Sequence, residues 1–296
     1  MKNIFLSLLA AVLLASCQIS FTDITEQKYD DDPMEIKLAL DMATKVTDQS
    51  YDYGDVVGLY VVNHPHSLVT SGNHYDNVPY EYWGNWEAPY KMFWLDGTTP
   101  ADFYCYYPYS EVNNIEEHEF SVQKHQTSYE AFIASDFTWG KVENVLPTDD
   151  VVEIPTRHLF SRVRIMVELG GGFTENEYMY YNFDVNLCNV KQHAKINLQT
   201  GEVTAIGEPS ELIPWFTWQD EYRKAIILPQ TVPDGSDLVA VRVDGKEFVL
   251  KKGVTFESGK SYTITIRLNK TSAGVNIGIE DWDDHEGDFG GVAEIL

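Results

Sequence analysis

The chain has few cysteines, and none is arranged for a metal site or a disulfide framework. Its 296 residues include three cysteines, Cys17, Cys105 and Cys188, and no CxxC pair. Disulfide-rich secreted domains carry more cysteines at regular spacings, and structural zinc sites use paired ones. Cys105 and Cys188 lie among aromatic or β-branched residues, which predicts two small buried side chains. A bridge between them is an open alternative without support in the pattern.

Catalytic motifs are missing as well. The chain contains no GxSxG, no HExxH, no phosphate-binding loop and no GxGxxG followed by a helical pattern. Its carboxylates are too scattered to single out a glycosidase pair. His158 stands alone beside a strand pattern, which favours a hydrogen-bonded structural histidine over a ligand or a catalytic base. The sequence therefore predicts a protein that is not an enzyme and uses no cofactor.

Basic residues are scarce. There are 21 Lys and Arg against 46 Asp and Glu, a formal net charge of −25. Such a charge argues against nucleic acid and anionic membranes as partners, because both would repel the chain. The acidic stretch from Asp281 to Asp288 invites a calcium interpretation, but its glycine comes one place late and His285 stands at a ligand position. We expect a solvated acidic tail and no metal.

No apolar run in the first residues is long enough to cross a bilayer as a helix, yet they do carry a signal. Ile4 to Leu14 is apolar, follows Lys2 and ends in Leu14-Ala15-Ser16-Cys17. A spanning helix needs about 20 apolar residues. Small residues before a cysteine are typical of a lipobox, at which the cysteine is acylated and the leader removed. A secretory signal with a chance cysteine is the alternative. We expect residues 1–16 to be a lipoprotein signal peptide and Cys17 to carry the lipid.

Helical periodicity is also absent over any segment longer than about ten residues, and alternation of apolar and polar residues takes its place. Residues 63–90 resemble a loop and 125–150 have a mixed pattern. Short strands with turns every 8–12 residues predict an all-β fold of sandwich-like domains. The expected strands lie at residues 35–40, 56–62, 101–108, 155–169 and 262–268, and the expected hairpins at 194–203 and 239–250, the second with its turn at Asp244-Gly245.

Changes in composition along the chain indicate a tether and two domains. Residues 17–34 are polar and acidic, which predicts a solvated tether. The glycines at 170–172 and the loops around 140–172 indicate a domain boundary, so we expect one β-sandwich at 35–150 and another at 151–296. In the first expected strand Ile36, Leu38 and Leu40 share one face.

Aromatic residues are plentiful, with 18 Tyr and 7 Trp. Trp83, Trp86 and Tyr90 lie close together in the sequence and offer rings that sugars stack on, although packing of a long loop against its own sandwich explains them better. A flat exposed row of these three would favour an alternative function, a carbohydrate-binding surface lipoprotein of a glycan-uptake system.

Six motifs in order resemble the fimbrillin family, the fimbrial subunit-like lipoproteins of Gram-negative anaerobes. The resemblance covers nearly the whole chain after the signal peptide. The motifs are Thr44-Lys45-Val46-Thr47 with the segment 53–60, the segment 102–108, the segment 154–163, Ile227-Leu228-Pro229-Gln230-Thr231, Gly259-Lys260-Ser261-Tyr262-Thr263-Ile264 and Ile279-Glu280-Asp281-Trp282.

The resemblance implies two transthyretin-like β-sandwich domains in a fimbrial subunit or pilin-like adhesin. It implies a surface-exposed outer-membrane lipoprotein with palmitate on its cysteine, which enters a fimbrium. A protease would remove the lipidated segment with the first strand, and other pilin subunits would fill the groove by β-strand addition. A host or bacterial surface ligand would complete the adhesion role.

Applied to this sequence, the scheme predicts proteolytic maturation after Lys45, with Lys37 and Lys28 as alternatives. The excised strand would carry Ile36, Leu38 and Leu40. The donor strand would come from the C-terminal tail, in which Gly290-Gly291 precedes Val292, Ala293, Ile295 and Leu296. The tail is short for a donor, so a tip subunit that accepts but does not donate fits equally.

Overall fold

The computed structural model of this chain describes residues 33–42, 51–169, 183–217, 221–243, 246–268 and 273–281. Residues 34–296 belong to one compact unit. Strands dominate the described ranges, whose one helix is the five-residue α1 (Tyr129–Ile133). The predicted all-β class is confirmed. Within these ranges no helix has the length and apolar character needed to cross a membrane.

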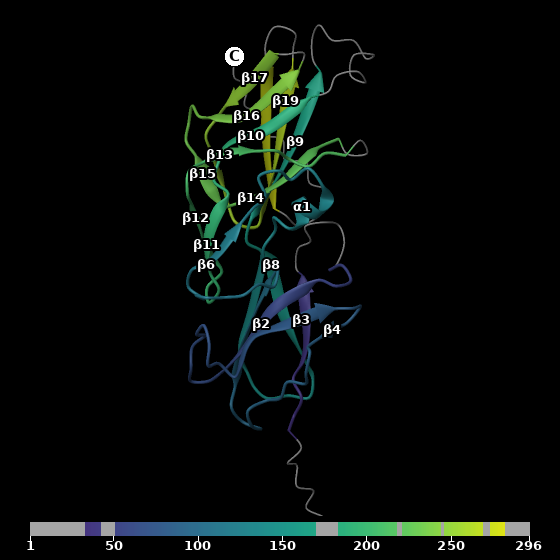
Figure 1. Ribbon diagram of the computed structural model, residues 1–296, viewed down its shortest axis with the longest axis vertical. Helices are drawn as coiled ribbons and strands as arrows, with labels where there is room; N and C mark the ends of the chain where they lie inside the picture. Colours follow the sequence, from purple (N-terminus) through teal and green to yellow (C-terminus); the bar gives the residue numbers. More distant parts are fainter. Residues whose placement is uncertain are drawn as a thin grey trace, which may run out of the picture. The chain divides into compact units, whose positions relative to one another are not determined.

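Seven strands form the largest sheet, and most come from the N-terminal half of the chain. Their order across the sheet is β1-β8-β7-β5-β2-β3-β4, and β1 pairs parallel to β8 while the other neighbours are antiparallel. Figure 1 shows β2, β3 and β4 beside one another. The bounds are β1 (Lys37–Met42), β2 (Val56–Asn63), β3 (Tyr75–Tyr82), β4 (Trp86–Glu87), β5 (Ala101–Tyr107), β7 (Thr138–Val145) and β8 (Val151–His158).

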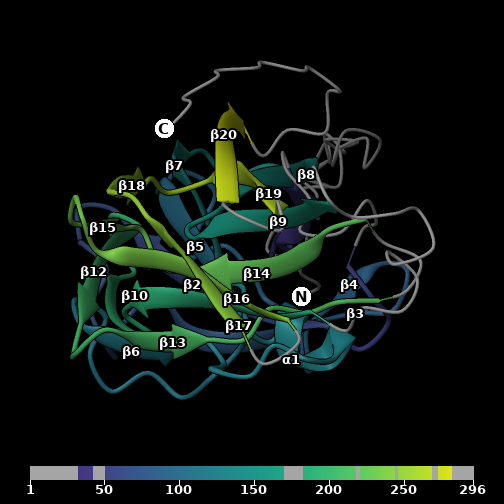
Figure 2. The same cartoon turned by 90° about the horizontal axis from the view of Figure 1, so that it is seen from above.

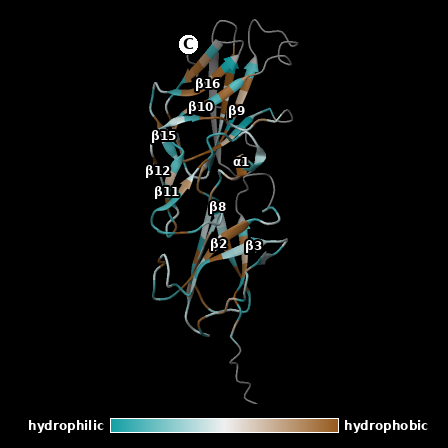
Figure 3. Ribbon diagram, viewed as in Figure 1, coloured by the Kyte–Doolittle hydropathy of each residue, from teal (hydrophilic) through white to brown (hydrophobic). Residues whose placement is uncertain are grey.

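Both faces of this sheet are covered at β2, which explains why Val56 to Val62 form an uninterrupted run without polar or charged side chains other than the Tyr60 hydroxyl. Successive side chains of a strand point to opposite faces. In β2, Leu59 and Val61 enter one hydrophobic core while Tyr60 and Val62 enter a second. The brown colour along β2 in Figure 3 shows this continuous apolar run. The sequence predicted a fully buried strand at residues 56–62, and all of it is buried except Val56, which is half-buried.

The remaining strands form four smaller sheets. Their orders are β13-β10-β16-β17, β14-β9-β19-β20, β12-β11-β6 and β15-β18. The bounds are β6 (His118–Ser121), β9 (Ser161–Leu169), β10 (Asp184–Val190), β11 (His193–Asn197), β12 (Glu202–Ile206), β13 (Ser210–Leu212), β14 (Arg223–Ile227), β15 (Gln230–Val232), β16 (Asp237–Val243), β17 (Lys246–Lys251), β18 (Val254–Phe256), β19 (Lys260–Leu268) and β20 (Ala273–Asp281).

The two four-stranded sheets share one core. Ile165 of β9 and Ile226 of β14 lie in the same cluster of buried residues as Leu187 of β10 and Val239 of β16. Figure 2 shows β9 and β14 beside β10 and β16 in the view from above. The alternation that predicted strands at 162–168 and 262–268 places every second side chain in this core.

Two sequence expectations were wrong in detail. Residues 63–90 are not all loop, because β3 and β4 lie there; Val78 and Tyr80 of β3 are buried, but the Asp, Asn and Pro residues around them concealed the alternation. Residues 155–169 are not one strand, because β8 ends at His158 and β9 begins at Ser161.

The expected domain division stays a prediction. The seven-stranded sheet includes β8, which comes after residue 150, and the next strand along the chain, β9, belongs to the sheet β14-β9-β19-β20. The chain therefore passes from one sheet to the other at Leu159 and Phe160, which are both buried.

Candidate functional site

Strand β1 is one of the two edge strands of the seven-stranded sheet, and Leu38 and Leu40 of this strand pack into the core. It runs parallel to β8, in a register that pairs Lys37 with Val151 and continues to the end of β1. Ile36, just before the strand, is 6% exposed and Leu38 is 8% exposed. Leu40 is half-buried and packs against the same cluster. The strand thus contributes one face to a core that the rest of the sheet encloses.

A second segment, residues 92–94, approaches β1 from the side away from β8. The Ile36 N–H donates to the Met92 carbonyl over 2.8 Å, and the Trp94 N–H donates to the Met34 carbonyl over 3.0 Å. Met92 and Trp94 are buried and Phe93 between them is half-buried. The alternation is one of burial alone, because Met92-Phe93-Trp94 is apolar throughout and carries no alternating pattern in the sequence. This segment supplies the far wall of the groove that holds β1.

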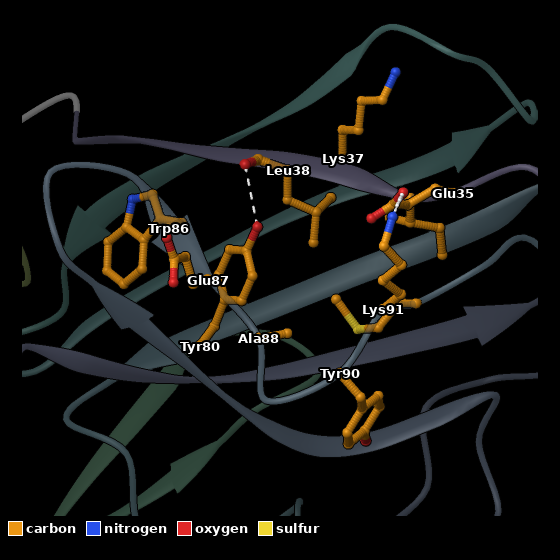
Figure 4. A pocket seen from close by; sticks show the side chains of 11 residues that line it. Glu35, Lys37, Leu38, Tyr80, Trp86, Glu87, Ala88, Tyr90 and Lys91 are labelled. Atoms are coloured by element: carbon orange, nitrogen blue, oxygen red, sulfur yellow. Dashed lines mark hydrogen bonds and ion pairs between the residues drawn. The ribbon is translucent and has the colours of Figure 1, made fainter.

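A pocket of about 460 Å³ lies between residues 35–38 on one side and Tyr80 with residues of the segment 86–92 on the other. Figure 4 shows Tyr80 extending across it toward β1, where its hydroxyl donates to the Leu38 carbonyl over 3.3 Å. Burial raises the pKa of the Tyr80 hydroxyl to about 12, so this group stays a neutral donor at physiological pH. The side chains around the pocket belong to Glu35, Ile36, Lys37, Leu38, Tyr80, Trp86, Glu87, Ala88, Tyr90, Lys91 and Met92.

The pocket lies against the backbone edge of β1. Backbone groups of alternate residues point to opposite sides of a strand within the sheet. The Ile36 N–H bonds to Met92, and the Leu38 carbonyl bonds to Tyr80. The backbone N–H and C=O groups of the even-numbered residues therefore point toward the pocket, and those of the odd-numbered residues point toward β8. An ion pair of 2.6 Å between Lys91 Nζ and Glu35 Oε2 lies at the rim, where exposure makes it worth little.

The backbone of β1 is bonded mainly on one side. A full ladder holds it on the β8 side, whereas the far side offers the short bridge near residue 36 and the bond from Tyr80. Loss of the strand would expose the apolar groove and the unpaired backbone of β8. Such an edge binds an added strand readily.

Most of the other predicted site residues lie outside the described residues. This holds for Cys17 and Lys45, for the alternative cleavage residue Lys28, and for the donor residues Val292, Ala293, Ile295 and Leu296. Lys45 falls between Met42, where β1 ends, and Tyr51, where the described chain resumes. Lys37 is exposed but lies within β1, where its Nζ donates to the Asp149 carbonyl over 2.8 Å. A protease needs an extended free segment, so a strand residue is the poorer cleavage point.

The row of Trp83, Trp86 and Tyr90 is not formed. Trp86 is half-buried and packs its ring against Tyr80 and Tyr51, at centroid distances of 5.7 and 4.6 Å. Trp83 and Tyr90 are both more than half exposed. The three-ring platform that would favour a glycan-uptake lipoprotein is therefore absent.

The remaining candidate groups are structural. His158 is buried and its Nδ1 lies 2.8 Å from Oδ2 of the equally buried Asp136, which confirms the predicted hydrogen-bonded histidine. Cys105 and Cys188 are buried and free, and burial raises the pKa of their thiols to about 12 and about 11. Among the described residues no cluster of His, Cys, Asp and Glu could hold a metal ion. The acidic tail after Asp281 lies outside them.

Comparisons with known proteins agree on one family. A family model described as fimbrillin-like matches residues 44–282. A protein of Bacteroides uniformis named "Putative fimbrium subunit Fim1C" is 23% identical over 291 residues, which are 93% of each chain. The crystal structure of a "putative cell adhesion protein" from the same species has a TM-score of 0.68 at 21% identity, over 84% of this chain and 99% of that one. A fimbrial protein of Bacteroides vulgatus has a TM-score of 0.52 at 13% identity, over 84% and 99%.

Proposed function

The chain belongs to the fimbrillin-like family and is a pilin-like adhesin of that family; from this premise we propose that another subunit replaces its first strand during assembly. The role is structural rather than catalytic, and its site is the fimbrium at the cell surface. The partners are other pilin subunits, which bind by β-strand addition.

The proposal rests on one observation. β1 is an edge strand, and its apolar side chains fill a hydrophobic core whose other residues come from the rest of the seven-stranded sheet and the segment 92–94. Ile36 and Leu38 are buried against residues of β2, β5 and β8. Full burial of such a side chain contributes about 1.5–3 kcal/mol. A subunit without β1 therefore gains a strong drive to accept a new strand of similar pattern.

The proposed sequence of events begins with export as an outer-membrane lipoprotein, acylated at Cys17 and held by the acidic tether 17–34. Cleavage after Lys45 then releases the lipid, the tether and β1 together. The groove beside β8 accepts a donor strand from another subunit, for which the C-terminal residues Val292, Ala293, Ile295 and Leu296 are the proposed source. A chain placed at the tip would accept a strand without donating one.

Lipidation is tested by metabolic labelling. Labelled palmitate is expected to enter the wild-type protein and to be absent from Cys17→Ala, because the thiol is the acylated group. Cys188→Ala is the matched control, since Cys188 is buried and should not alter labelling. Equal labelling of wild type and Cys17→Ala would remove the anchor from this scheme.

Maturation is tested by mild trypsin treatment of the intact protein. The new N-terminus is expected to be Val46, because residues 43–50 are mostly polar and come directly after β1 in the sequence. Lys45→Ala should resist this cleavage, while Lys37→Ala should be cut like the wild type. Native gels with a partner pilin then report association of the cleaved form.

Two outcomes contradict the scheme at different points. A first cut elsewhere than after Lys45 overturns the maturation residue alone. Correct cleavage without any association with a pilin partner overturns strand replacement itself.

A further inference from the structure

Two exposed aromatic rings lie side by side near the β3–β4 connection. Tyr53 is 73% exposed and Trp83 is 54% exposed. Their ring centroids are 6.4 Å apart and their planes are inclined by 35°. Exposed aromatic rings that adjoin one another present a continuous apolar surface to a ligand.

Two glycine turns hold these rings in place. Gly54 and Gly84 have φ values of +92° and +91°, which side chains other than glycine rarely adopt. The Gly54 N–H donates to the Tyr82 carbonyl and the Tyr82 N–H donates to the Asp55 carbonyl, over 2.8 and 2.9 Å. A Cβ built on Gly84 would lie 3.5 Å from the Tyr53 ring, an ordinary contact distance, so the ring lies directly against this turn.

A stack of aromatic rings supports the exposed pair from below. Tyr82 lies 6.1 Å from Tyr53 in a stacked arrangement and 5.2 Å from Trp86. Trp86 in turn stacks on buried Tyr80, with ring planes inclined by 8°. The surface is therefore ordered before any ligand arrives, which lowers the entropy cost of binding.

A carboxylate stands next to Tyr53 in the chain. Asp52 is exposed, precedes Tyr53 and accepts a hydrogen bond of 3.3 Å from the Tyr129 hydroxyl through Oδ2. A carboxylate has about four lone-pair positions, so Asp52 retains the capacity to accept from a ligand hydroxyl. The Asp52 N–H donates to Asp55 Oδ2 over 2.8 Å, which fixes the turn that carries both groups.

The size and charge of this surface indicate which class of ligand it can bind. A fully buried aromatic side chain covers about 150–250 Å², and these two rings are only partly exposed. A stable protein interface needs about 800 Å² from each partner, so the surface suits a small ligand instead. Asp52 and the net charge of −25 disfavour an anion. A neutral pyranose has an apolar C–H face and a rim of hydroxyls, which match the two rings and the carboxylate.

We infer that Tyr53 and Trp83 form a binding platform for neutral sugar rings, with Asp52 accepting a hydrogen bond from a sugar hydroxyl. This inference goes beyond strand replacement and does not depend on it. It gives the adhesin a ligand class, neutral oligosaccharides, at a place distinct from the groove of β1.

The test begins with the purified protein on an array of neutral oligosaccharides, alongside oligosaccharides that contain uronic acid. The best neutral binder is then titrated by calorimetry. Trp83→Ala and Tyr53→Ala are each expected to weaken binding about tenfold, the loss of one ring contact. Asp52→Asn should weaken it less, because an amide oxygen still accepts a hydrogen bond.

Tyr90→Ala is the matched control. Tyr90 is 53% exposed and pairs with Tyr75 rather than with the platform. It should bind like the wild type, and all variants should keep the wild-type melting temperature.

Three results would overturn the inference. They are no binding to any neutral oligosaccharide, binding to acidic ones alone, and equal losses in Trp83→Ala and Tyr90→Ala. Loss of self-association in Trp83→Ala without any sugar binding would reassign the rings to a protein contact.

Discussion

Removal of residues 34–42 from the folded protein is expected to lower its melting temperature by on the order of 10 °C, and the same segment added as a peptide is expected to restore most of it. The estimate rests on Ile36 and Leu38, which are nearly fully buried. Each contributes about 1.5–3 kcal/mol. In a chain of this size, 1 kcal/mol shifts the melting temperature by about 2–4 °C.

The experiment needs a cut whose position is known. A recognition sequence for a specific protease replaces residues 43–48, between β1 and Tyr51, and the cleaved N-terminal segment is removed by gel filtration under mild denaturant. Calorimetry then follows the remaining chain with and without a peptide of residues 34–42. A peptide with Leu38→Asp is the matched control, because a charge at that position cannot enter the groove without a large desolvation cost.

Two outcomes separate the possibilities. A melting temperature that is unchanged after removal would mean that β1 contributes nothing to the fold. Equal rescue by the wild-type and Leu38→Asp peptides would mean that binding does not use the core-facing side chains. Either result contradicts strand replacement, whereas rescue by the wild-type peptide alone demonstrates that the groove accepts a strand added in trans.

The parallel ladder between β1 and β8 explains why a vacant groove should also promote association. Without β1, the backbone groups of Val151 to Thr156 that face it lose their partners. Unpaired backbone at a sheet edge pairs with any extended chain of suitable pattern. The cleaved protein should therefore associate more readily than the intact one, and the wild-type peptide should suppress that association.

Alternation along single strands was readable from the sequence, but the partners of those strands were not. Ile36 and Leu38 stand out because every second residue is apolar, and both are buried. Nothing local indicates that Lys37 pairs with Val151, which is more than a hundred positions away. Pairing over such separations is decided by the whole core, and a short pattern carries no record of it.

The same limit applies to the groove. Its far wall at residues 92–94 is an apolar run of only three residues, which is too short to distinguish a strand from a loop. Trp86 shows that the sequence can also suggest an exposure that the fold removes. An aromatic residue in a polar segment looks exposed, yet packing against Tyr80 and Tyr51 covers much of its ring. The pairing of Tyr53 with Trp83 depends on two turns that meet only in the folded chain.

Substitution His158→Ala is expected to lower the free energy of unfolding by about 3–5 kcal/mol, the cost of breaking a buried pair by removing one partner. His158 is 0% exposed and Asp136 is 1% exposed. The imidazole Nδ1 lies 2.8 Å from Asp136 Oδ2. The alanine leaves a cavity where the ring was and removes this hydrogen bond from a carboxylate that water cannot reach. The pair lies where the chain leaves β8 for β9, so both sheets should lose stability together.

Urea denaturation followed by tryptophan fluorescence measures the effect, and a second histidine provides the control. His64 Nε2 lies 2.7 Å from Asp102 Oδ1, but the His64 side chain is 37% exposed. Asp102 Oδ1 also accepts the Asn144 N–H over 2.7 Å, so it keeps a partner in His64→Ala. That variant should lose no more than about 1 kcal/mol, because the histidine it removes is solvent-accessible and the carboxylate keeps a hydrogen bond. Equal losses in the two variants would show that burial does not set the strength of the His158 pair.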